Sequence, residues 1–199
     1  MKKWKFLTAA AALTLMLAAC GDDEAKDTSA EDTGAETTQT EDKEATETAA
    51  FPMTIKSLTS SRDDEESGKT ITFEDVTLEE MPERIITLDY GFLDTLDALG
   101  VEGIVGIAAN GGKGNIPTHL KEKYVVDGVA DVGTLKQIDF EAVAAAQPDV
   151  IFISGRQSPF YEELKEIAPV VFVGATQEDY WNTFKASVDI AAQIFNKEA

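Results

Sequence analysis

The sequence has very few of the residues that build catalytic and metal sites. Among its 199 residues there are one Cys and one His. One Cys cannot form a disulfide within the chain, and one Cys with one His cannot supply a Cys/His zinc cluster. There is also no nucleophile elbow, no His-Glu-x-x-His motif and no Ser–His–Asp arrangement. We therefore expect a protein that is not an enzyme and that uses no metal site or resident cofactor.

Positive charge is also scarce. The chain has 17 Lys and Arg residues against 37 Asp and Glu residues, which gives a net charge of −20 at pH 7. A protein that binds nucleic acid needs a basic face for the phosphate backbone. The composition therefore argues against a nucleic-acid partner.

The N-terminus resembles a bacterial export signal. Three Lys residues within the first five positions precede an apolar run from Phe6 to Ala19, too short to cross a hydrocarbon layer of about 30 Å. The run ends in Leu17-Ala18-Ala19-Cys20-Gly21, which resembles a lipobox, in which the Cys is acylated and becomes the new N-terminus. An ordinary signal peptide with a chance Cys is the alternative. We predict a signal peptide over residues 1–19 and a lipid anchor at Cys20 on the extracytoplasmic face of the cell membrane.

Residues 20–50 have the composition of a tether. They contain eleven acidic residues against Lys26 and Lys43, and no aromatic or large aliphatic residue. Such a segment cannot bury enough apolar surface to offset the entropy lost on ordering. We predict a disordered acidic spacer; an acidic metal-binding tail is a more elaborate alternative.

Residues 51–199 alternate short apolar runs with segments of helical periodicity. A hairpin region is predicted over 51–79, in which Thr54–Leu58 pairs with Thr70–Phe73 across a polar turn at 62–68. An α/β lobe follows over 80–175, and a long amphipathic helix begins near Thr176 and fills 176–199. The alternation predicts an α/β fold with a parallel sheet and right-handed crossovers. The expected strands are 84–88, 104–108, 128–132, 149–154 and 170–173, and the expected helices of the lobe are 92–99, 117–124, 140–146 and 160–167.

Ligands of parallel sheets bind at the carboxyl ends of the strands. Five segments follow a predicted strand and are therefore candidates: Asp89–Gly91, Ala109–Asn115, Gly133–Thr134, Gly155–Gln157 and Gly174–Ala175.

Arg156 is the most informative residue in these segments. It is one of three Arg residues in the chain and directly follows a strongly apolar strand. A guanidinium group at that place can donate two parallel hydrogen bonds to an anion or stack on an aromatic ring. A salt bridge to Glu162 or Glu163 explains it equally well.

The other candidates are weaker. Lys113 lies in a glycine-rich loop that can present it to an anion, but the loop lacks the spacing of a nucleotide-binding P-loop, and a plain surface loop remains open. His119 has no second metal-ligating neighbour, which favours a surface residue. Tyr180 and Trp181 are expected to pack in the core rather than to stack on a ligand.

Several segments together resemble a known family. In order and spacing, they resemble iron-siderophore ABC transporter binding lipoproteins of the helical-backbone (class III) periplasmic-binding-protein family. The run Ile153–Ser158, with Tyr161 and Lys165–Pro169, resembles the petrobactin-type catecholate binders of Gram-positive bacteria. The resemblance covers about residues 80–197. The other segments that carry it are Pro82–Leu88, Leu93–Val101, Ile104–Gly106, Asp131–Thr134 and Gln147–Ile151.

The resemblance implies two α/β lobes joined by a long helix, with a ferric siderophore held between them. This chain then corresponds to the N-terminal lobe and the start of the connecting helix, with the second lobe absent. It implies a binding protein that delivers its ligand to an ABC permease. A same-fold binder of haem, cobalamin or another metal complex stays open, as does a single-lobe remnant without transport activity.

The resemblance also implies roles for individual residues. A ferric siderophore of this type is anionic, so Arg156 is the expected principal contact. Lys113, Lys136, Gln157 and the aromatic face of Tyr90 are additional expected contacts. Asp94 stands where related proteins carry a Glu that docks on the permease. The siderophore supplies the ligands of the iron, so the protein performs no chemistry on the metal.

Overall fold

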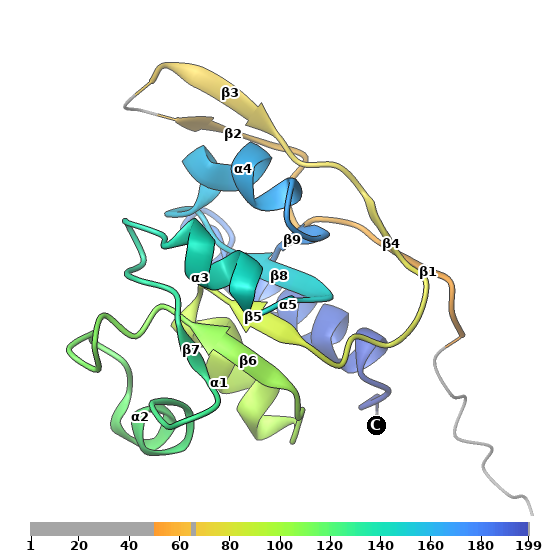
Figure 1. Cartoon of the computed structure of the whole chain (residues 1–199). Helices are drawn as coiled ribbons and strands as arrows, with labels where there is room; N and C mark the ends of the chain where they lie inside the picture. Colours follow the sequence, from red (N-terminus) through yellow and green to blue (C-terminus); the bar gives the residue numbers. More distant parts are fainter. Residues whose placement is uncertain (1–49, 65–66, 199) are drawn as a thin grey trace, which may run out of the picture. The chain divides into compact units, whose positions relative to one another are not determined.

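The computed structural model describes residues 50–64 and 67–198 (Figure 1). The predicted signal peptide, Cys20 and the tether up to residue 49 lie outside these residues. No helix within the described ranges is long and apolar enough to cross a membrane.

The centre of the fold is a five-stranded parallel sheet, which confirms the predicted α/β class. All four pairings between neighbouring strands are parallel. The inner strands are buried on both faces, which explains why they read as continuous apolar runs rather than alternating ones. The strand order is β7 (Ala130–Asp131), β6 (Ile104–Ile107), β5 (Ile85–Thr87), β8 (Val150–Ile153) and β9 (Val170–Phe172).

Helices cover both faces of the sheet (Figure 1). Helices α1 (Tyr90–Ala98) and α5 (Tyr180–Ile194) pack on one face, and α3 (Phe140–Ala145) and α4 (Tyr161–Lys165) pack on the other. A 3₁₀ turn, η1 (Ser158–Phe160), leads into α4, and α2 (Thr118–Tyr124) packs beside α1. Since the crossovers from β5 to β6 and from β8 to β9 use opposite faces, the sheet has a topological switch point between β5 and β8.

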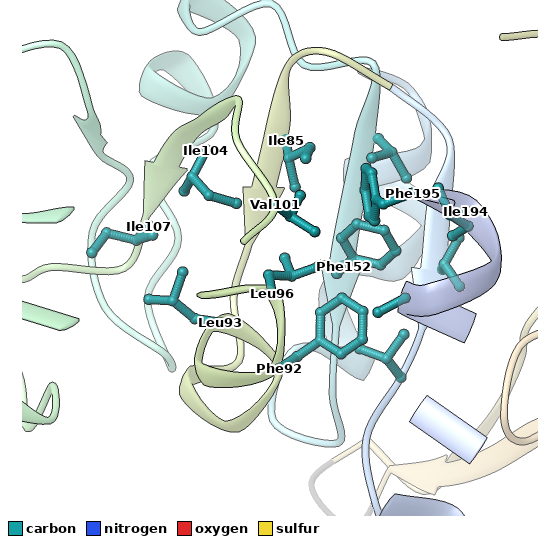
Figure 2. Packing of buried hydrophobic residues seen from close by; sticks show 14 of the residues in the cluster. Ile85, Phe92, Leu93, Leu96, Val101, Ile104, Ile107, Phe152, Ile194 and Phe195 are labelled. Atoms are coloured by element: carbon teal, nitrogen blue, oxygen red, sulfur yellow. The ribbon is translucent and has the colours of Figure 1, made fainter. Parts of the chain in front are cut away.

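Side chains alternate along β8, so this strand contributes to the hydrophobic clusters on both faces of the sheet. Phe152 points toward α1 and α5, whereas Ile151 and Ile153 belong to the cluster under α3 and α4. The Phe152 ring lies 4.6 Å from that of Phe92 and 6.4 Å from that of Phe195, centroid to centroid (Figure 2). Burying a side chain of this size contributes about 1.5–3 kcal/mol, so these contacts fix the helices on the sheet.

The predicted pairing of the N-terminal hairpin is wrong. Strand β1 (Met53–Ile55) pairs with β4 (Val76–Leu78), while β2 (Ser61–Asp64) pairs with β3 (Lys69–Thr72). The polar segment predicted as a turn therefore contains most of β2. That strand carries exposed polar side chains, so no apolar alternation marks it in the sequence.

The start of the last helix also differs from the expectation. Helix α5 begins at Tyr180 and not near Thr176, whose hydroxyl accepts the backbone N–H of Asp179 at 3.3 Å. Tyr180 and Trp181 were expected in the core, yet they are 59% and 65% exposed. The reason is that α5 buries Ser187, Ala191 and Ile194, in its second half, and leaves its first turn exposed.

Candidate functional site

A cavity of about 800 Å³ lies at the carboxyl ends of the strands. This size falls within the range of small-molecule sites, and its place beside the switch point is where parallel sheets bind ligands. A smaller hollow of about 280 Å³ lies at the opposite end of the sheet, beside the start of β6. The larger cavity is lined by Tyr90 after β5, by Asn110, Gly114 and Asn115 after β6, by residues 134–137 after β7, and by Arg156 after β8.

Arg156 is exposed in the lining of this cavity. Among the described residues, no carboxylate lies within 4.0 Å of its guanidinium group. Of the two partners considered from sequence, Glu162 contacts Lys165 at 3.8 Å, and Glu163 makes no such contact with Arg156. The positive charge of Arg156 is therefore available to a ligand.

Gln157 has a different role from the predicted one. Its side chain is fully buried and is not part of the cavity wall. Its Oε1 accepts the backbone N–H of Ser154 at 3.1 Å, and its Nε2 donates to the carbonyl of Leu135 at 2.7 Å. Gln157 thus ties the loop that carries Arg156 to the loop after β7. It positions the site and does not face the ligand space.

Tyr90 is part of the cavity wall, and its hydroxyl is already engaged. The hydroxyl donates to the carbonyl of Ala108 at 2.6 Å. Burial, followed by the nearby Asp131 carboxylate, raises the pKa of Tyr90, while Arg156 acts in the opposite sense. A Cβ atom on Gly114 would lie 2.8 Å from the Tyr90 hydroxyl, so only glycine fits there without a shift. The aromatic face is the part of Tyr90 that a ligand can contact.

Asp131 links the loops after β6 and β7, a role that the sequence did not indicate. Its carboxylate accepts the backbone N–H groups of Ala109 and Asn110 at 3.0 Å each, and also that of Gly111. It accepts the N–H of Gly133 at 3.1 Å as well. One carboxylate thereby fixes the loops after β6 and β7. The signal in the sequence was slight: an Asp at the end of a short strand, just before a Gly-Thr turn.

Of the two Lys residues that were predicted to contact a ligand, one lines the cavity and the other does not. Lys136 lines the cavity together with Tyr90 and Arg156. Lys113 is exposed in the loop after β6 but is not part of the wall. No group of three or more His, Cys, Asp or Glu side chains in the described part of the chain is arranged to hold a metal ion.

Asp94 lies on α1 and does not line the cavity. Its Oδ1 is 2.7 Å from Nε2 of His119 on α2, and both side chains are more than half exposed. His119 is therefore a surface residue, as predicted. One turn further along α1, Asp97 accepts the hydroxyl of Tyr124 at 2.7 Å and also contacts Lys123.

Comparison with known proteins identifies the family. The family model described as "Periplasmic binding protein" matches residues 85–199. The chain belongs to this family. The resemblance found in the sequence is thereby confirmed, and the matched region contains the whole five-stranded sheet.

Individual relatives agree with this assignment. The chain is 42% identical over 117 residues to the petrobactin-binding protein YclQ of Bacillus subtilis, covering 59% of this chain and 36% of that protein. It is 40% identical to the crystal structure of the iron-uptake substrate-binding protein PiuA from Streptococcus pneumoniae, with a TM-score of 0.55, covering 62% of this chain and 42% of that one. The catecholate-siderophore binding protein VctP from Vibrio cholerae is 32% identical, with a TM-score of 0.54 and coverage of 61% and 42%. The chain thus spans well under half the length of these relatives.

Proposed function

We propose that this chain captures a ferric siderophore of the catecholate, petrobactin type for delivery to an ABC permease. The observation that carries the proposal is Arg156. Its guanidinium lines the cavity at the switch point and has no carboxylate partner among the described residues. The family membership and the names of the relatives YclQ and VctP support the choice of ligand.

Charge explains how such a ligand binds to an acidic domain. Residues 51–199 contain 12 basic and 26 acidic residues, while a ferric tris-catecholate carries three negative charges. Exposed carboxylates more than about 8 Å away are largely screened at physiological salt, whereas a cation at the cavity wall acts at contact distance. Arg156 and Lys136 supply the attraction, and the Tyr90 ring supplies an apolar face. The siderophore itself coordinates the iron, so the protein needs to recognise only charge and shape.

Delivery and anchoring complete the proposal. We place the permease contact at Asp94 on α1, outside the cavity, so that one surface holds the ligand while another docks. We assign Cys20 to a lipid anchor on the extracytoplasmic face of the cell membrane, and the acidic segment after it to a spacer.

The first test is a titration of the purified chain with ferric petrobactin, followed by quenching of protein fluorescence. Arg156→Ala is expected to weaken binding more than about tenfold, since a charge-assisted hydrogen bond to an anion is lost. Lys185→Ala is the matched control, because Lys185 is an exposed cation on α5 outside the cavity wall. Equal affinities for Arg156→Ala and the unmodified chain would contradict the site.

A ligand panel tests the type of ligand. Haem and cobalamin are titrated beside ferric petrobactin under the same conditions. Preferential binding of either one favours a same-fold binder of another metal complex. Failure of all three to bind contradicts the proposed function and favours a single lobe without transport activity.

A further inference from the structure

The three Arg residues of the chain fall into two kinds. Arg84 is used by the fold: its Nε donates to the carbonyl of Gln147 at 2.8 Å, and its Nη2 donates to that of Ala146 at 2.5 Å. Arg62 and Arg156, in contrast, have no carboxylate within ion-pair distance among the described residues. Both guanidinium groups are exposed, so their charge is available to a ligand even in a domain with more than twice as many acidic as basic residues.

Arg62 reaches the loop that carries Arg156. It lies on β2 of the N-terminal hairpin, an element that packs against η1 beside α4 (Figure 1). A Cβ atom built on Gly155 would lie 2.7 Å from Nη1 and 2.8 Å from Cζ of Arg62. The guanidinium therefore fills the space that a side chain at position 155 would occupy. The absence of a side chain at Gly155 lets Arg62 lie against the backbone next to Arg156.

The Arg62 guanidinium therefore lies against the residue that precedes Arg156 in the chain. Like charges at short range disfavour each other unless an anion lies between or beside them. The fold supplies no such anion among the described residues, while the cavity that Arg156 lines is open to a ligand.

We propose that Arg62 is a second anion contact of the ligand site, contributed by the β2–β3 hairpin. This inference rests on the proposed function and extends it. The hairpin lies outside residues 85–199, so it adds a cation to the part of the chain that matches the family. The ligand class that fits two guanidinium groups is a polyanionic ferric complex with a peripheral carboxylate, such as a citrate-centred catecholate. Arg62 lies against Gly155 and is not among the residues that line the cavity. We therefore assign the anionic core of the complex to Arg156, and to Arg62 a peripheral carboxylate that extends beyond the cavity wall.

Two independent variants test the role of Arg62 in the full chain, with ferric petrobactin as the probe. Arg62→Gln removes the charge, and binding is expected to weaken about fivefold. This is less than the loss expected for Arg156→Ala, because solvent screens the charge of the exposed Arg62 side chain. Gly155→Ala keeps the Arg62 side chain, but the new methyl group occupies the space of its guanidinium and forces it to move. Binding is expected to weaken to a similar degree. Because both changes act on the same contact, the double variant is expected to bind no more weakly than either single one.

Lys69→Gln is the matched control, since it removes a cation from the same hairpin at exposed β3 and is expected to leave affinity unchanged. Thermal unfolding of each variant separates binding from support of the hairpin. Unchanged affinity in Arg62→Gln overturns the inference, and so does a loss of affinity accompanied by a lower unfolding midpoint. If the unmodified chain itself fails to bind ferric petrobactin, the proposed function fails. If the unmodified chain binds ferric petrobactin and Arg62→Gln binds it equally well, only the proposed Arg62 contact is rejected and the proposed function stands.

Discussion

At the scale of single residues, the clearest electrostatic feature outside the cavity is the Asp97–Tyr124 contact between α1 and α2. The side-chain hydrogen bond from Lys123 and then that from Tyr124 lower the pKa of the Asp97 carboxyl. Burial, followed by the hydrogen bond to Asp97, raises the pKa of Tyr124 from 10.0 to about 12. The tyrosine thus keeps its proton more tightly in the folded state than in the unfolded chain.

This contact predicts a stability loss at high pH that Tyr124→Phe reduces, while the part that comes from the raised pKa of Tyr90 remains. A group with a raised folded-state pKa stabilises the fold fully below its unfolded value of about 10, and that contribution is lost as the pH rises from about 10 to 12. At ~1.4 kcal/mol for each pKa unit, the loss is at most about 3 kcal/mol. Urea unfolding at several pH values between 7 and 11.5 measures it. At pH 7 the variant is expected to be about 1–2 kcal/mol less stable, because the hydrogen bond to Asp97 is gone.

Tyr180→Phe is the control for this experiment, because the Tyr180 side chain is exposed at the start of α5. It is expected to follow the pH dependence of the unmodified chain. A decline between pH 10 and 11.5 that is equally steep in Tyr124→Phe would contradict the assignment of the raised pKa to Tyr124.

At the scale of elements, Asp94 on α1 and His119 on α2 lie outside the cavity wall, and Asp94 tests the docking proposal. Its contact with His119 is solvent-exposed, so breaking it changes the free energy of unfolding by less than about 1 kcal/mol. Asp94→Lys is therefore expected to fold normally and to bind ferric petrobactin normally. Uptake of radiolabelled iron by cells is expected to stop, because Lys reverses the charge of the side chain that we propose docks on the permease.

Glu163→Lys makes the same charge reversal on α4, on the other face of the sheet, and is expected to leave uptake intact. Normal uptake by Asp94→Lys cells, with the protein present at normal levels, would place the docking surface elsewhere.

The same elements show which features a sequence can predict. Strands β5 and β8 were predictable because both are buried on both faces, so their sequence is continuously apolar. Strand β2 was not, because its exposed polar residues carry no periodic pattern and its pairing depends on β3. The position of Arg156 in the cavity wall was predictable from its place shortly after a strand, while its contact with a ligand stays a prediction. The role of Asp131 was not, because the N–H groups of the loop after β6 that it accepts are some twenty residues away in sequence.

Contacts between distant segments also explain the errors at α5 and Gln157. Tyr180 and Trp181 lie in a helix, as their spacing predicts, but spacing does not say which turns of a helix are buried. Gln157 follows Arg156 in a loop at the carboxyl ends of the strands, where the cavity lies. Its side chain nevertheless turns inward and donates to the carbonyl of Leu135. The edge that holds the site can therefore be predicted from local pattern, while the direction of each side chain requires the fold.

At the scale of the whole molecule, the negative charge falls in two segments of different composition. Residues 20–50 carry eleven acidic and two basic residues in a segment without large apolar side chains, whereas the domain combines its acidity with a cavity that presents Arg156. We propose that the first segment extends a spacer by self-repulsion between Cys20 and the domain. A spacer of this kind is useful only if its first residue is fixed to the membrane.

Cys20→Ala is the decisive change for this arrangement. Without the thiol there is no acylation site, and the protein is expected to move from the membrane fraction to the culture medium, as followed by immunoblotting of both fractions. A high-salt wash of the membranes serves as the control, because it removes protein held by charge and leaves protein held by an acyl chain. The unmodified chain is expected to resist the wash. Retention of Cys20→Ala on washed membranes would mean that something other than Cys20 anchors the protein.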